Sequence, residues 1–248
     1  MTSLLNNDGF RLTGIGIAVI LFLASPTQAL TIHADTSGIY RKSGDGSLDS
    51  ATIDPNGTFM FVAWNPNAEG NEIRDFATFD LSVVPSNEII TGAELHIGLH
   101  DLGLSSPDPT ETIEWVSTST SAASLAAGVY SDAIWEDLGT GTSYGSRTVT
   151  AADNGTTLVS VLNADAVSAM NASLGGPFSL GGHLTSIDMT GPTQEALFFN
   201  GFGQPTELVL TTEVVPEPGT AGLLGLSLVL LSAVRRTARP RARPGVDR

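Results

Sequence analysis

The sequence predicts an all-β protein, a two-sheet β-sandwich or jelly roll that carries one or two short helices. Short runs of apolar or alternating residues recur along the chain, and the clearest, residues 92–100, places Ala93, Leu95, Ile97 and Leu99 on one face. Turn-forming stretches such as DPNG, VPSN and SSPDP separate these runs. About ten such runs fall between residues 30 and 214, a length that can bury a proper core as one domain.

Each run is interpreted as a strand, because alternation with a period of two buries one face and exposes the other. The expected strands are residues 30–34, 58–64, 76–81, 92–100, 112–118, 147–151, 156–162, 183–189, 196–200 and 206–212.

One helix is expected to begin after Asn163, whose side chain suits the N-cap position. Gly175 and Gly176 are expected to end it. Its apolar stripe is expected to cover an open edge or end of the sandwich. The stripe consists of Ala164, Val167, Met170 and Leu174. A second short helix is expected at residues 122–127.

Residues 1–29 are predicted to be a secretory signal peptide. Arg11 precedes an apolar run at residues 15–24, and Thr27 and Ala29 place small residues at the −3 and −1 positions. Cleavage by signal peptidase is therefore expected after Ala29, during export. The alternative is an N-terminal membrane anchor, which the run of about ten residues disfavours because a span needs roughly 20.

Residues 215–248 combine three features in a fixed order. The motif Val215-Pro216-Glu217-Pro218 is expected to stay extended, because proline restricts the residue before it. An apolar run at residues 221–234 follows, and as a helix it spans about 21 Å of a hydrocarbon core about 30 Å thick. Snorkelling arginines can close part of that gap. The arginines that should stop transfer and remain cytoplasmic are Arg235, Arg236 and Arg239.

The segment VPEPGTAGLLGLSLVLLSAVRR closely resembles the PEP-CTERM sorting signal, which has a Pro-Glu-Pro motif, an apolar helix and an arginine-rich end. The resemblance covers the last 34 residues. It implies that an exosortase, a membrane transpeptidase-like enzyme of Gram-negative bacteria that make extracellular polysaccharide, processes the chain. It also implies an inner-membrane precursor and a final place at the cell surface or in the extracellular (biofilm) matrix. The alternative is a plain C-terminal anchor with an accidental motif.

Two central segments carry further resemblances. The stretch RDFATFDLSVVPSNEIITGAELHI, residues 74–97, resembles the opening of jelly-roll domains of the carbohydrate-binding kind in secreted bacterial proteins. The stretch LNADAVSAMNASLGGPFSLGGHL, residues 162–184, is similar to a segment common in β-sandwich ectodomains of PEP-CTERM proteins. Both resemblances imply the fold more than an activity.

The charge of residues 30–214 excludes some classes of partner. This segment contains 23 acidic residues and four basic ones, Arg41, Lys42, Arg74 and Arg147, for a formal net charge of −19. Such a surface repels nucleic acid and anionic lipid headgroups. The chain has no cysteine, so an exported domain must hold its fold without disulfides.

No catalytic constellation is evident. The chain has no Gly-x-Ser-x-Gly turn, and a pair of carboxylates for glycoside hydrolysis cannot be singled out among so many acids. His96 and His100 lie on one strand, about 13 Å apart, too far to share one metal ion. His33 and His183 have no ligand-like neighbours, and all four histidines are expected at the surface or in turns.

A calcium site is one interpretation of the loop DGSLDSATIDPNG, in which Asp45, Asp49 and Asp54 supply oxygen ligands. The alternative is an acidic surface loop. No other cofactor is expected.

Exposed aromatic rings that stack on sugars are a second possibility, against the alternative that these rings belong to the core. Residues 130–139 are the best candidate for an exposed binding loop, because acids flank its aromatics. The candidate rings are Trp64, Trp115, Trp135, Tyr130 and Tyr144.

Three functions remain open at this point. The first is a non-enzymatic surface protein that binds or organises extracellular polysaccharide. The second is a secreted glycan-active enzyme, and the third is a structural surface module without a specific ligand.

Overall fold

The computed structural model describes residues 27–47, 49–58, 60–65, 71–188, 193–199 and 205–215. Most of the predicted signal peptide, the motif residues Pro216, Glu217 and Pro218, the apolar run 221–234 and the arginines after it lie outside these residues. None of the helices in the described part has the length and hydropathy to cross a membrane.

The described part is mostly β, with twelve strands and three helices. The strands are β1 (Thr27–His33), β2 (Thr36–Lys42), β3 (Ser50–Asp54), β4 (Met60–Asn65), β5 (Asn71–Asp80), β6 (Glu88–Ser105), β7 (Thr110–Ser117), β8 (Ser143–Thr150), β9 (Thr157–Val161), β10 (Pro177–Leu184), β11 (Glu195–Phe199) and β12 (Glu207–Val214). The helices are α1 (Ala122–Ala126), α2 (Asp132–Thr140) and α3 (Ala164–Ala172).

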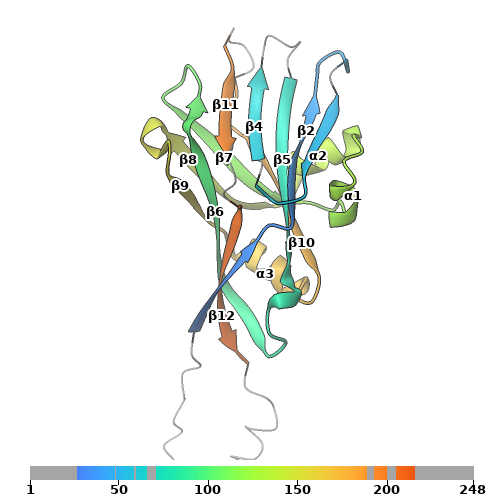
Figure 1. Ribbon diagram of the computed structural model, residues 1–248, viewed down its shortest axis with the longest axis vertical. Coiled ribbons are helices and arrows are strands. Elements are labelled where there is room, and N and C mark those ends of the chain that lie inside the picture. The colour runs from blue at the N-terminus through green and yellow to red at the C-terminus, as the bar shows by residue number, and fades with distance from the viewer. Residues whose placement is uncertain are drawn as a thin grey trace, which may run out of the picture.

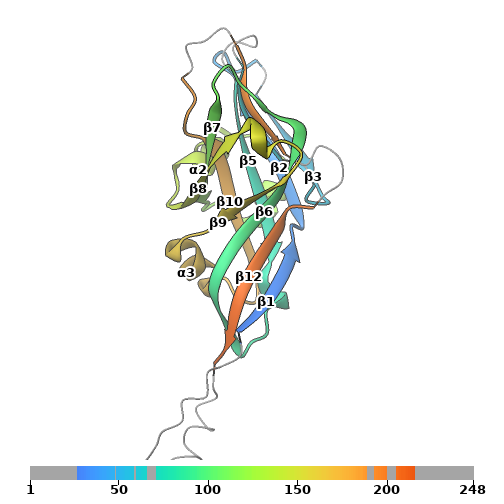
Figure 2. The ribbon, with the colours of Figure 1, turned by 90° about the vertical axis from the view of Figure 1, so that its left-hand side faces the viewer.

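All strand pairs are antiparallel, and they form one curled, β-sandwich-like sheet in the order β1-β12-β6-β11-β4-β5-β10-β7-β8. The two long strands β6 and β5 bend with the curl of the sheet and pair with different neighbours along their lengths (Figures 1 and 2). The first part of β6 pairs with β12 and β9, and its last part pairs with β11. One edge of β5 pairs with β2, and its other edge pairs first with β4 and then with β10.

The main core lies inside the curl. As predicted, Ala93, Leu95, Ile97 and Leu99 all point into it from β6. Its largest fully buried side chain is Trp115 of β7. Each fully buried large apolar side chain contributes roughly 1.5–3 kcal/mol, so this alternation dominates the stability of the fold.

Helix α3 confirms the prediction made from Asn163. The side-chain oxygen of Asn163 accepts hydrogen bonds from the backbone amides of Asp165 and Ala166, as an N-cap should. Of the predicted stripe, Met170 is fully buried, and Val167 and Leu174 pack partly buried against the core. Ala164 is exposed instead, and Ala166 is the buried residue of the first turn. The helix ends two residues before Leu174, and Gly175 has a positive φ of 83° in the turn that follows.

Helices α1 and α2 cover the outer side of β2 and β5 (Figure 1). The residues buried between them are Tyr40, Phe76, Leu125, Trp135 and Leu138. Gly181 of β10 permits this close approach, because a Cβ atom at that position would lie 2.6 Å from the carbonyl oxygen of Leu138. The helix predicted at residues 122–127 is confirmed as α1.

Three expectations of local structure are wrong. Residues 130–139 are not an exposed loop, because helix α2 begins at Asp132. Ser131 caps this helix. The strand expected at 183–189 is instead β10, which ends at Leu184, because residues 177–184 pair with both β5 and β7. Strand β2 was not expected, and β3 lies inside the stretch interpreted as a loop.

The chain enters and leaves the described part at the same end (Figures 1 and 2). Strands β1 and β12 are antiparallel neighbours, with Thr27 opposite Glu213. The amide of Val215 then donates a 2.8 Å hydrogen bond to the carbonyl oxygen of Asn87. Ala29, the predicted cleavage position, lies within β1 opposite Thr211, and Leu30 follows it opposite Leu210.

Candidate functional site

A solvent-open groove with a volume of about 440 Å³ lies beside α3. One wall is the segment that links β7 to α1, residues 118–122, and the other is the C-terminal part of α3 with Ser173. Residues 177–179, at the start of β10, and Tyr144 of β8 complete the lining. Seven of the twelve lining residues carry a hydroxyl group, and Ala169 and Ala172 leave the groove open because their side chains are small.

Asp137 of α2 holds the first wall in place. Its carboxylate accepts hydrogen bonds from the hydroxyl of Thr118, from the amide (3.1 Å) and hydroxyl (2.9 Å) of Ser119, and from the amide (2.8 Å) and hydroxyl (2.7 Å) of Thr120. Burial alone would raise the pKa of Asp137, but the hydrogen bonds from Thr118, Thr120 and Ser119 outweigh it and lower the pKa to about 2. The carboxylate is therefore ionised at any physiological pH.

An aromatic pair lies at the inner side of the groove. The rings of Tyr144 and Phe178 stack with centroids 5.9 Å apart and planes 24° apart. Both side chains are buried and belong to the main core. The pair gives the inner side of the groove a rigid support, since both rings are fixed by packing on the sheet.

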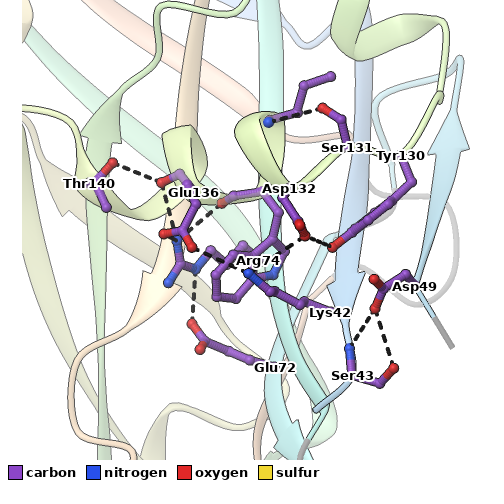
Figure 3. A network of polar contacts seen from close by, with 12 residues as sticks. Lys42, Ser43, Asp49, Glu72, Arg74, Tyr130, Ser131, Asp132, Glu136 and Thr140 are labelled. Carbon is purple, nitrogen blue, oxygen red and sulfur yellow. Dashed lines mark hydrogen bonds and ion pairs between the residues drawn. The ribbon is translucent and has the colours of Figure 1, made fainter. Parts of the chain in front are cut away.

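Trp135 is held by two cations and is not free to stack on a sugar. The guanidinium of Arg74 lies 3.5 Å from the centre of its ring, and the ammonium group of Lys42 lies 4.6 Å from it. Arg74 also donates to the carbonyl oxygens of Trp135 (3.1 Å) and Glu136 (3.2 Å) and to the carboxylate of Glu72 (2.9 Å). This arrangement fastens α2 to β5 (Figure 3).

Lys42 completes the same network from β2. Its ammonium group lies 3.6 Å from the carboxylate of Asp132 and 3.3 Å from that of Glu136 (Figure 3). The hydroxyl of Tyr130 donates to Asp132 at 2.8 Å. The network therefore holds α2 against β2 and β5.

The structure places the other candidate rings in the core. Trp64 and Trp115 are buried, as are Trp135 and Tyr144, while Tyr130 is half-buried. The core alternative is thus the correct one for the three tryptophans.

The three aspartates of the expected calcium site do not come together. Asp45 and Asp49 lie in the loop before β3, where they accept hydrogen bonds from Ser47 and Ser43. Asp54 lies at the far end of β3 and accepts hydrogen bonds from the turn that follows, including the amide and hydroxyl of Thr58. Within the described ranges, no three acidic or histidine side chains are grouped so that they could hold a metal ion.

The histidines each have a neighbouring partner. His96 and His100 both lie on β6, His96 within 2.9 Å of Glu94, and the ring of His100 accepts from the amide of Leu102. His33 is exposed and lies 3.5 Å from Glu207. His183 differs from expectation because it lies in β10 and is largely buried, 3.7 Å from Glu114. Burial, followed by the charge of Arg74, lowers the pKa of His183.

Buried carboxyl groups are features that the sequence did not single out. Asp75 of β5 is fully buried, and neither of its side-chain oxygens has a hydrogen-bond partner among the described residues. Glu111 is also fully buried, and Ser106 and Ser186 donate to it. Burial, with the charges of Glu111 and Asp188, raises the pKa of Glu195. None of these acids lines the groove.

Comparison with known proteins adds no relative to this description. No protein-family model matches the chain, and no curated protein sequence matches it.

Proposed function

We propose that this chain is an exported surface protein whose domain binds extracellular polysaccharide without catalysing a reaction. The observation that carries the proposal is the groove beside α3, which is lined by hydroxyl groups and rests on a fixed aromatic pair. Grooves that bind sugars need convergent polar groups in a concave, largely pre-formed surface. The curled antiparallel sheet suits a jelly roll of the carbohydrate-binding kind, which is the finer fold that we propose.

The proposed route to the surface uses both ends of the chain. Signal peptidase cuts after Ala29 during export, and an exosortase recognises Pro216-Glu217-Pro218. The apolar helix 221–234 holds the precursor in the inner membrane of a Gram-negative bacterium, with Arg235, Arg236 and Arg239 on the cytoplasmic side. Because β1 and β12 are neighbours, both terminal segments start from one end of the domain, and cleavage after Ala29 would leave β1 to begin at Leu30, opposite Leu210.

Binding to the host's own extracellular polysaccharide tests the function. Full-length protein, extracted in a mild detergent, is titrated with that polysaccharide in a calorimeter. Saturable binding is expected, and it should not require calcium. If a cooperatively folded sample binds nothing, the structural-module alternative is correct. Release of sugar fragments during the titration would instead reveal a glycan-active enzyme.

A further inference from the structure

Four of the hydroxyl groups that line the groove already donate their protons inside the protein. Thr118, Ser119 and Thr120 each donate their hydroxyl proton to the carboxylate of Asp137. On the opposite wall, Ser173 donates its proton to the carbonyl oxygen of Ala169 at 2.9 Å. A hydroxyl group has one proton and two lone pairs. These four side chains therefore have acceptor lone pairs left for a ligand, and their donors are committed.

The described part of the chain brings no positive charge to the groove. Among these residues, the lining contains no lysine, arginine or histidine. The carboxylate that holds one wall, Asp137, stays ionised because its pKa lies at about 2. Three of the four basic residues between positions 30 and 214 are engaged elsewhere: Lys42 and Arg74 hold α2, and Arg147 lies 3.1 Å from Asp153.

We infer that the groove binds a neutral, hydroxyl-rich segment of polysaccharide and rejects uronate or sulfate groups. This inference rests on the proposed function and specifies its ligand class. Sugar hydroxyls can donate to the acceptor-rich wall, whereas a carboxylate or sulfate brings only acceptors and a negative charge. An acidic sugar in the groove would face unpaired lone pairs and the charge of Asp137 without a compensating cation.

The test uses the host's polysaccharide in two forms, native and with its carboxyl groups chemically reduced to alcohols. Full-length protein in mild detergent is titrated with each form. The reduced form should bind at least as tightly as the native form, and more tightly where the native polymer contains uronic acid. Loss of binding on reduction would overturn the inference while leaving the proposed function intact. Failure of both forms to bind would overturn the proposed function itself.

A pair of variants locates the site. Ala172→Trp fills the groove from an exposed position of α3, and Ala133→Trp adds the same ring at an exposed position of α2 that does not line the groove. Ala172→Trp should weaken binding of the reduced polysaccharide by about tenfold or more, which corresponds to about 1.4 kcal/mol, and Ala133→Trp should not. Equal affinity of the two variants would overturn the assignment to this groove. Circular dichroism establishes that both variants fold.

Discussion

The carboxylate of Asp137 accepts hydrogen bonds from both the amide and the hydroxyl of Thr120, which precedes it by 17 positions. Helix α2 therefore sets the position of the wall that faces the groove, although the helix itself does not line it. Arg74 and Trp135 hold α2 in place. The side chain of Asp137 links this docking to the shape of the groove.

Asp137→Asn should loosen the groove wall. The amide keeps one oxygen but loses the charge that strengthens its hydrogen bonds, and an NH₂ group then meets the donor protons of the wall. We expect a loss of about 1–2 kcal/mol in the free energy of unfolding, together with faster amide exchange at residues 118–120. Urea denaturation and exchange measurements test both. Asp108→Asn, at an exposed position, is the control and should change neither; unchanged exchange in Asp137→Asn would contradict the assigned role.

Arg74→Lys should undock α2. Lysine cannot reproduce the planar stacking on Trp135 while it donates to two backbone carbonyl groups. The expected cost is about 1–3 kcal/mol in thermal or urea unfolding, with a change in tryptophan fluorescence. Arg147→Lys is the matched control, because the Arg147 ion pair is half-exposed and should contribute less than about 1 kcal/mol. A cost no larger than that of the control would show that α2 docks by apolar packing alone.

Asp75 should make the protein less stable as pH rises. Burial raises the pKa of Asp75 well above 3.8. The unfolded chain therefore gives up this proton first, so the contribution of Asp75 to stability is greatest below about pH 3.8 and falls as pH rises towards the raised pKa. Asp75→Asn removes the titrating group and should flatten the profile between pH 4 and the raised pKa. If the free energy of unfolding of Asp75→Asn fell with pH as steeply as that of the original protein, this account would be refuted. Asp108→Asn again serves as the control.

The position of Asp75 explains why its carboxyl group lacks a partner. It lies where one edge of β5 passes from β10 to β4, opposite Gly182. A Cβ atom at Gly182 would lie 2.2 Å from an oxygen of Asp75 and 2.5 Å from the ring of Trp115. The carboxyl group thus fills space that glycine leaves at a fork in the sheet.

Replacing Pro216-Glu217-Pro218 by three alanines should block sorting. In a host that contains an exosortase, we expect an unprocessed form to accumulate in the inner membrane, seen by cell fractionation and immunoblotting. Three alanines at Thr91-Gly92-Ala93 would alter strand β6 and therefore cannot serve as a control. The control is Ala133→Trp, which leaves the motif intact. Unchanged processing of the triple-alanine variant would show that the motif is not the signal.

Sequence patterns predicted those parts of the fold that depend on local periodicity. The alternation in β6 and the cap at Asn163 are both found, because each is decided within a few residues. Helix α2 was missed because its apolar residues, Ile134, Trp135 and Leu138, are few and the rest of its surface is polar or small. Its packing partners lie far away in the chain: the rings of Tyr40 and Phe76 and the cations of Lys42 and Arg74.

The groove could not be predicted for the same reason. Its walls come from residues 118–122, 169–173 and 177–179, which the pairing of β10 with β7 and the capping of α3 bring together. Serine, threonine and alanine in these segments carry no spacing that distinguishes a binding wall from an ordinary turn. The key side chain, Asp137, was one acid among many until its five hydrogen bonds were known.

Hydrogen–deuterium exchange of the full-length protein, with and without the host's polysaccharide, tests the central claim most directly. We predict that polysaccharide slows exchange at residues 118–122 and 172–179, with little change in β1 and β12, which lie at the other end of the strand order. Slowed exchange confined to other segments, or none at all under conditions of saturable binding, would contradict the assignment of this groove as the glycan site.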